Sequence, residues 1–143
     1  MAMISEMEIE VRSTELDALG HVNQAKWVEY LEWGRYDWMR ASGLTGYFLG
    51  GEGVGSVMAN LNVDFRREAR LGDRLTVRTW LAAVGRSSFR FGQEVRGAGG
   101  DVLCGSVATA VTFDMRARAA VPIPDALRAT LESLVHTASE DGG

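Results

Sequence analysis

The sequence predicts an α+β fold in which a curved antiparallel β-sheet wraps around one long central helix, with a short helix near the C-terminus. A proline-free stretch of helical periodicity runs from Asn23 to Ser42. One strand-like run precedes it, and four more follow it, separated by glycine-containing turns. A broad apolar helix beside consecutive antiparallel strands packs most economically in two layers, one sheet around one helix.

The first element expected is a strand near the N-terminus. Apolar Met7, Ile9 and Val11 alternate with the charged residues between them. This is the two-residue period of a strand with one buried face. A short loop over residues 13–22 then leads into the long helix.

The long helix is predicted from the spacing of its large apolar side chains. Trp27, Tyr30 and Trp38 recur at helical intervals, and no proline interrupts the stretch. Because the apolar faces are wide, the helix should be covered on more than one side. Gly43 follows as a plausible C-terminal stop, since glycine readily adopts the left-handed conformation that ends many helices.

The second half of the chain alternates like a series of strands. After a glycine-rich linker at residues 49–55, alternation places five apolar residues on one predicted face: Val57, Ala59, Leu61, Val63 and Phe65. Further strands are expected near residues 75–81, 89–95 and 103–113. A short helix begins near Pro124, a residue that suits the first turn of a helix.

Composition limits the classes of function. A chain of 143 residues is the usual size of one domain, here predicted as residues 1–143 with a core of about 6–135 and a disordered tail after His136. Cys104 is the only cysteine, which excludes an intrachain disulfide and favours a reducing, cytoplasmic location. The net charge of −4 argues against nucleic-acid or membrane partners. Neither a signal peptide nor a membrane span is recognisable.

One segment combines an acid, a glycine turn and a helix start. Asp17 lies in the loop, Gly20 allows close backbone approach, and Asn23 is a favourable N-cap. The first backbone amides of a helix have no intrahelical acceptor and lie at the positive end of its dipole. They can therefore polarise a carbonyl oxygen. An acid beside glycine is also a common turn cap, so the residues alone leave both roles open for Asp17.

This segment resembles a family signature. The 4-hydroxybenzoyl-CoA thioesterase-like branch of the hotdog-fold superfamily carries D-x-x-G-H-V-N-N before an aromatic-rich helix, and this chain has DALGHVNQAKWVEYLEWGR. Later strands and hairpins of the family are resembled by VDFRREARLGDRLTV, VGRSSFRF and ATAVTFDMRARAAVPIPDALR. The resemblance covers roughly residues 6 to 130. It implies a hotdog fold and an acyl-CoA thioesterase.

The resemblance also implies a mechanism. The matching aspartate, Asp17, would attack the thioester carbon or activate water, while a backbone amide between Gly20 and Ala25 would stabilise the oxyanion. Coenzyme A would enter only as part of the substrate, with no metal and no prosthetic group. The enzyme would work as a homodimer or homotetramer with its acyl pocket between subunits.

The site residues expected on this basis fall into two groups. The catalytic group is Asp17, Gly20, His21 and Asn23. The substrate-binding group is Val22, Gln24, Trp27, Asn60, Arg86, Ser87 and Ser88, the last three at the hairpin where relatives bind the nucleotide of coenzyme A. Arg66, Arg67 and Arg70 are alternative phosphate ligands. Trp27 and the other helix aromatics are expected chiefly as core.

Two rival functions remain. A hotdog dehydratase or hydratase would act on the same thioesters, but that chemistry usually pairs a histidine with an acid on the helix, and this helix contains no histidine. A non-catalytic acyl-CoA-binding protein would keep the fold without hydrolysis. The acyl chain, the choice between coenzyme A and acyl-carrier-protein thioesters, and the nucleophile or base role of Asp17 stay open.

Overall fold

The computed structural model describes residues 2–45 and 53–136. Its elements are β1 (Ile4–Glu10), a short 3-10 helix (Ser13–Glu15), α1 (Gln24–Ser42), β2 (Val54–Phe65), β3 (Arg74–Val84), β4 (Ser88–Arg96), β5 (Val102–Asp114), β6 (Ala119–Ala120) and α3 (Asp125–Leu134). The predicted order of strand, long helix, four strands and short helix is confirmed. The 3-10 helix and the two-residue β6 were not predicted.

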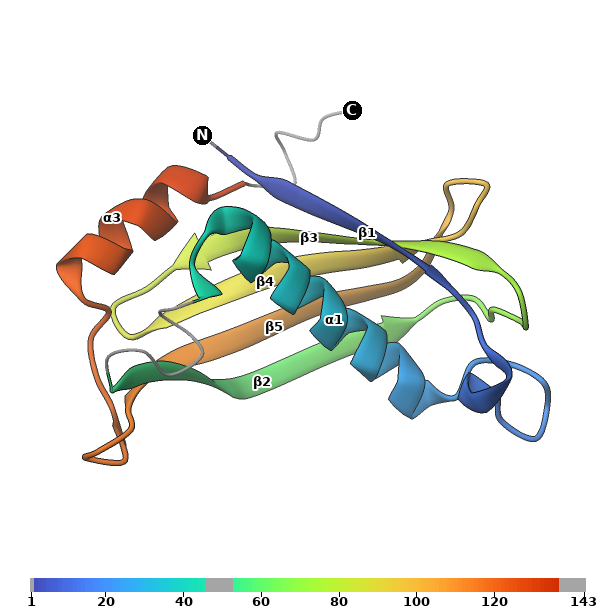
Figure 1. Ribbon diagram of the computed structural model, residues 1–143, viewed down its shortest axis with the longest axis horizontal. Coiled ribbons are helices and arrows are strands. Elements are labelled where there is room, and N and C mark those ends of the chain that lie inside the picture. Colours follow the sequence, from blue (N-terminus) through green and yellow to red (C-terminus); the bar gives the residue numbers. More distant parts are fainter. Residues whose placement is uncertain (1, 46–52, 137–143) are drawn as a thin grey trace.

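The strands form one antiparallel sheet that curves around α1 (Figure 1). The strand order is β1-β3-β4-β5-β2, and β6 pairs with the end of β5. Helix α1 packs chiefly against β1, β3 and β4. At the opposite edge of the sheet, β2 pairs only with β5 among the described residues. Helix α1 therefore does not cover β2, and one side of the helix lies next to this uncovered edge of the sheet.

Both ends of α1 agree with the sequence analysis. The Asn23 side chain accepts a hydrogen bond from the backbone N–H of Ala25, as an N-cap does. Gly43 ends the helix with φ at 78°, in the left-handed region that favours glycine. The position of the helix start, and with it the predicted site, is thus fixed by local sequence.

The core consists of two apolar clusters, one toward each end of α1. The first gathers Trp38, Phe91 and Leu127, and the second gathers Trp27 and Leu75. Between them α1 approaches the sheet closely at a glycine. A Cβ atom on Gly34 would lie 2.5 Å from Val77 Cγ1 and 3.0 Å from Gln93 Nε2. Gln93 also donates a hydrogen bond from its amide nitrogen to Leu31 O at 2.8 Å, so the middle of α1 makes a polar contact with the sheet.

The predicted face assignment of β2 is wrong at its first residue. The register against β5 shifts between Met58 and Asn60, which leaves Ala59 in a bulge. Met58 and Leu61 consequently pair with buried residues of β5 and share the face toward α1, while Val57 lies on the opposite face. One extra residue in the strand reverses the alternation that precedes it.

Two predicted segments fall partly or wholly outside the described residues. Of the glycine-rich linker at residues 49–55, the positions 49–52 lie outside, while Val54 and Gly55 already belong to β2. The predicted disordered tail at residues 137–143 lies outside as well. The last described residue, His136, is buried, and its backbone N–H donates to Leu81 O at 2.8 Å.

Candidate active site

The loop that carries Asp17 is anchored by a buried acid. Glu15 is only 8% exposed, and its carboxylate accepts hydrogen bonds from the Arg12 backbone N–H at 2.9 Å and from the Tyr30 hydroxyl at 2.7 Å. Burial, and then the bond to Glu15, raises the pKa of Tyr30 well above its ordinary value. The tyrosine therefore stays a protonated donor, and it ties the loop to the side of α1.

Asp17 is held in a tight turn. One carboxylate oxygen, Oδ1, accepts from the backbone N–H of Leu19 at 2.9 Å and from that of His21 at 3.2 Å. Gly20 follows with φ at 83°, which a residue with a side chain would adopt only under strain. Asp17 thus acts as a turn cap. Its second oxygen, Oδ2, receives no hydrogen bond from the described residues, so the capping role leaves half of the carboxylate available.

The hydrogen bonds at the helix start narrow the choice of amide donor. Within the predicted window Gly20–Ala25, five of the six backbone N–H groups have acceptors in the described part of the chain. The pairs are Gly20 with Asp17 O, His21 with Asp17 Oδ1, Val22 with Ala69 O, Asn23 with Glu15 O, and Ala25 with Asn23 Oδ1. The N–H of Gln24 has none among the described residues. It is the first residue of α1, where the helix dipole is most positive.

Asp17 and Gln24 both line one surface depression of about 550 Å³. Six of the residues predicted from the sequence lie around it: Asp17, His21, Val22, Asn23, Gln24 and Trp27. The β2 end and the following loop complete the wall with Phe65, Arg66, Arg67 and Glu68. Trp27 is 4% exposed and belongs mainly to the core, as the helical spacing indicated. The depression combines an acid, an amide donor and two arginines.

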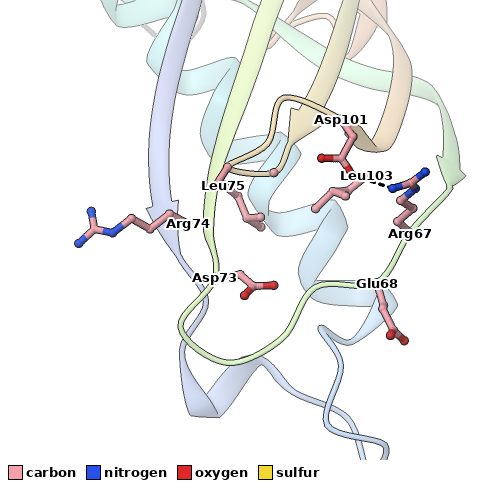
Figure 2. Close-up of a pocket in the computed structure, with 9 residues that line it drawn as sticks. Arg67, Glu68, Asp73, Arg74, Leu75, Asp101 and Leu103 are labelled. Atoms are coloured by element: carbon pink, nitrogen blue, oxygen red, sulfur yellow. Dashed lines mark hydrogen bonds and ion pairs between the residues drawn. The ribbon is translucent and has the colours of Figure 1, made fainter.

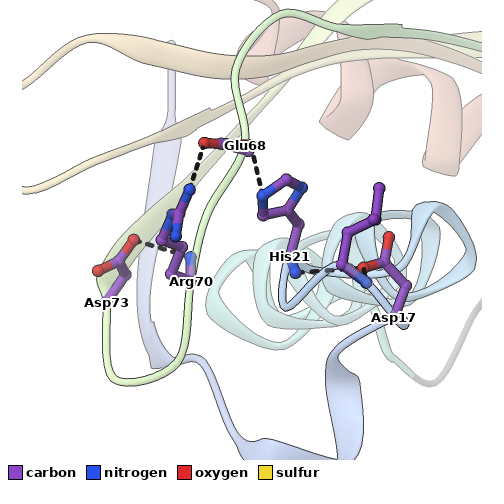
Figure 3. Close-up of polar contacts among 6 residues, drawn as sticks. Asp17, His21, Glu68, Arg70 and Asp73 are labelled. Atoms are coloured by element: carbon purple, nitrogen blue, oxygen red, sulfur yellow. Dashed lines mark hydrogen bonds and ion pairs between the residues drawn. The ribbon is translucent and has the colours of Figure 1, made fainter.

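Glu68 is a further residue at the site, one that was not predicted from the sequence. Its Oε2 atom lies 2.7 Å from His21 Nε2, and its Oε1 atom lies 3.0 Å from an Arg70 guanidinium nitrogen (Figure 3). The Arg70 backbone N–H in turn donates to Asp73 at 2.9 Å. These contacts hold the His21 ring, which belongs to the loop before α1, against the loop between β2 and β3. A glutamate in an arginine-rich turn gives no sequence signal for such a role.

The remaining predicted substrate contacts lie elsewhere in the chain. Asn60 pairs with Thr109 in the sheet and does not line the depression. The hairpin of Arg86, Ser87 and Ser88 joins β3 to β4 at the end of the sheet near α3 (Figure 1). Since β3 has 11 residues, about 3.3 Å each, the hairpin is on the order of 35 Å from the start of that strand. Their binding roles stay predictions.

A second depression, of about 620 Å³, lies beside the first (Figure 2). It shares Arg67 and Glu68 with the first depression but includes neither Asp17 nor the start of α1. An ion pair between Arg67 and Asp101 at 3.0 Å crosses its wall. Its carboxylates are already engaged: Asp101 pairs with Arg67, Glu68 pairs with Arg70, and Asp73 accepts from the Arg70 backbone N–H. The smaller depression is the better candidate for the active site.

Other kinds of site find little support in residues 2–45 and 53–136. In these ranges no group of three or more histidine, cysteine, aspartate or glutamate side chains is placed to hold a metal ion. Across the same residues, no helix has the length and apolar character that a membrane crossing requires.

Comparison with known proteins matches both the fold and the site segment. The family model of the thioesterase-like superfamily matches residues 11–131. The long-chain acyl-CoA thioesterase FadM of Escherichia coli strain K12 is 30% identical over 129 residues, which cover 90% of this chain and 97% of FadM.

Solved structures agree in fold. YbaW, a probable thioesterase from Escherichia coli, superimposes with a TM-score of 0.75 at 29% identity, covering 92% of this chain and 98% of YbaW. The hypothetical protein TT1821 from Thermus thermophilus gives a TM-score of 0.83 at 28% identity, covering 94% and 100%. The predicted hotdog fold is thereby confirmed. The chain belongs to the thioesterase-like superfamily and is a thioester hydrolase.

Proposed function

We propose that this enzyme hydrolyses acyl-CoA thioesters to a free carboxylic acid and coenzyme A. Asp17 is the nucleophile or general base, and the Gln24 N–H is the oxyanion donor. One observation carries the proposal: the same depression is lined by Asp17, which has one oxygen without a partner among the described residues, and by Gln24, which has the one amide of the Gly20–Ala25 window without an acceptor among them. Hydrolysis of a thioester needs this pair of groups and little more, because a thiolate leaves readily.

In the reaction the thioester oxygen accepts a hydrogen bond from the Gln24 N–H. As nucleophile, Asp17 Oδ2 attacks the carbonyl carbon to form a tetrahedral adduct. The C–S bond then breaks and the thiolate leaves, which produces a mixed anhydride between the acyl group and Asp17 that water hydrolyses. As general base, Asp17 instead takes a proton from the water that attacks the carbon. Asp17 Oδ1 keeps its two backbone donors in either case, so the carboxylate holds its orientation throughout.

Coenzyme A is the proposed carrier of the acyl group. Arg66 and Arg67 line the depression beside Asp17, and arginine binds phosphate oxygens with a planar fork of donors. FadM, with which this chain shares 30% identity, is a long-chain acyl-CoA thioesterase. An aliphatic acyl-CoA is therefore the first substrate to test. The chemistry requires no metal and no prosthetic group, and a cytoplasmic location fits a chain with a single cysteine.

We also propose that the enzyme is a homodimer, or a homotetramer of such dimers, with shared sites. The β2 edge is available for antiparallel pairing with the β2 of a second copy. Such pairing would bring the opposite end of the partner's sheet to the end that carries Asp17. The hairpin at residues 86–88, distant from Asp17 within one chain, would then lie on the same side of the dimer as the partner's active site.

The test measures free thiol released from a panel of aliphatic, branched and aromatic acyl-CoA and acyl-carrier-protein thioesters. Two variants at one position isolate the amide. Gln24→Pro removes the N–H at the first helical position together with the glutamine side chain. Proline is tolerated there, and Asn23 already has the extended backbone that precedes proline. Gln24→Ala keeps the N–H and removes the side chain.

We expect Gln24→Pro to lower kcat by about 10²–10³-fold, the usual effect of losing one oxyanion donor, and Gln24→Ala to retain most of the activity. Equal activity of the two variants would exclude the Gln24 backbone N–H as the oxyanion donor. If no thioester in the panel released thiol, the proposed hydrolysis would be wrong. A hydratase or a non-catalytic acyl-CoA-binding protein would then be the better assignment.

A further inference from the structure

Arg35 is a buried cation in the middle of α1. It is 6% exposed, and one guanidinium nitrogen donates to Gln93 Oε1 at 3.0 Å. The Gln93 amide nitrogen donates to Leu31 O at 2.8 Å and to Thr79 Oγ1 at 3.0 Å. Both polar atoms of the Gln93 side chain are thus engaged: the nitrogen fixes the amide, and the oxygen orients one edge of the Arg35 guanidinium. Burial lowers the pKa of Arg35, as expected for a charge withdrawn from water.

No ion pair neutralises this charge within the described part of the chain. Apart from the bond to Gln93, the guanidinium makes no hydrogen bond there. The acid that acts on it electrostatically is Glu32, one turn earlier in α1, but the Glu32 side chain is exposed and makes no ion pair with Arg35. A buried charge is costly unless an opposite charge accompanies it. The arrangement calls for a carboxylate from outside the chain.

Arg35 lines a cavity of about 240 Å³ that lies between α1 and the β2 edge. Its other walls include Glu32, Tyr36 and Met39 of α1 and Met58 of β2. Tyr36 and Met58 are 48% and 43% exposed, which is high for large apolar side chains beside a core. Because α1 packs chiefly on β1, β3 and β4, it does not cover the surface along β2. We call this surface, formed by Glu32, Arg35, Tyr36, Met39 and Met58, the strip.

We infer that a second copy of this chain covers the strip, with its α1 antiparallel to this one, and that Glu32 of the partner subunit pairs with Arg35. A twofold axis makes every contact reciprocal, so Arg35 of the partner subunit would receive Glu32 of this chain. Residues three apart share one helix face. An acid and a base at this spacing therefore meet twice when two such helices lie antiparallel and the twofold axis passes between positions 32 and 35.

Charge complementarity favours this occupant. The strip offers one buried cation and, one turn away on the same helix, one exposed acid, which makes the surface complementary to itself. Each pairing would neutralise a guanidinium and bury Tyr36 and Met58 at the same time. The inference rests on the proposed homodimer and is independent of the proposed thioesterase chemistry.

The test is the dimer dissociation constant, measured by sedimentation equilibrium for the full chain. Glu32→Gln removes the charge, and Glu32→Arg reverses it, at a position exposed enough to leave the monomer fold intact. Glu132→Arg on α3 is the matched control, because Glu132 pairs with Arg128 of its own helix. We expect Glu32→Gln to weaken the dimer at least about tenfold, Glu32→Arg to weaken it further, and the control to match the parent.

Mixing variants adds a positive result. Glu32→Arg and Arg35→Glu should each dimerise poorly alone but form a heterodimer in native mass spectrometry, because one interchain pair is then restored with its signs exchanged and the other keeps the parental acid and base. If Arg35→Glu does not fold, the Glu32 variants decide alone. Parent-like dimerisation of both Glu32 variants would overturn this inference while leaving the homodimer intact. A monomeric parent chain would overturn both, whatever its thiol release.

Discussion

At the scale of single residues, some polar groups of the loop before α1 are hydrogen-bonded within the described residues and others are not. Asp17 Oδ1 holds the turn through two backbone donors, whereas Oδ2 takes no hydrogen bond from the described residues. Gln24 likewise has the one amide in its segment without an acceptor there. A turn cap and a catalytic group usually compete as explanations for one acid. Here the two oxygens allow both, since one fixes the orientation in which the other is presented.

Cys104 provides a prediction about reactivity. It is fully buried in the cluster under the start of α1, and burial raises the pKa of its thiol to about 11. Since only the thiolate attacks disulfide reagents, native protein should not react with an aromatic disulfide at pH 8 and should release one equivalent after unfolding. Rapid reaction of the native protein at pH 8 would contradict the buried position. The same reagent could then not be used to follow coenzyme A release.

Some residues of the site could be predicted from the sequence and others could not. Asp17 and the helix start were predictable because acid, glycine and N-cap are neighbours in the chain. The choice of Gln24 was not, because the acceptors that occupy the competing amides of Val22 and Asn23 come from Ala69 and Glu15. Glu68 was missed for the same reason: its partner His21 is 47 positions away in the sequence and is brought near only by the folded loops.

At the scale of elements, β3 and β4 depend on one tryptophan and one glycine. Trp80 pairs with Gly92 in the sheet register, and a Cβ on Gly92 would lie 2.4 Å from the indole ring. The indole therefore covers the glycine. We expect Gly92→Ala to lower the free energy of unfolding by about 1–3 kcal/mol, the usual cost of overpacking.

The matched background is Trp80→Thr, which removes the ring. There Gly92→Ala should be neutral or stabilising, because alanine restricts the unfolded chain more than glycine does. Chemical denaturation of the four proteins measures the coupling. Additive effects of the two substitutions would mean that the indole does not rest on Gly92.

Strand β2 illustrates how far periodicity reaches. Its existence followed from alternating residues, but its start at Val54 and the bulge at Ala59 did not, since a bulge preserves the composition of a strand while shifting its phase. Val57 was accordingly assigned to the wrong face. The same shift places Met58 toward α1, where it lines the cavity at Arg35. The feature that sequence reasoning missed therefore shapes the proposed interface.

At the scale of the whole molecule, the α+β architecture was predictable and the assembled site was not. Element type and order follow from local periodicity, which the chain keeps almost throughout. The distance between Asp17 and the hairpin at residues 86–88 depends instead on strand length and direction. Within one chain the two predicted parts of the substrate site are far apart. The homodimer is the arrangement in which both predictions can hold.

The most direct test of the central claim is the rate of coenzyme A release by Asp17→Asn, measured on the best acyl-CoA of the panel. Asparagine keeps an oxygen that can accept from Leu19 and His21, so the turn is retained while the carboxylate is lost. Asp101→Asn, in the neighbouring depression, is the control. We expect Asp17→Asn to lower kcat by about 10²–10⁴-fold with unchanged melting temperature and assembly, and the control to be active. Undiminished turnover by folded Asp17→Asn would contradict it.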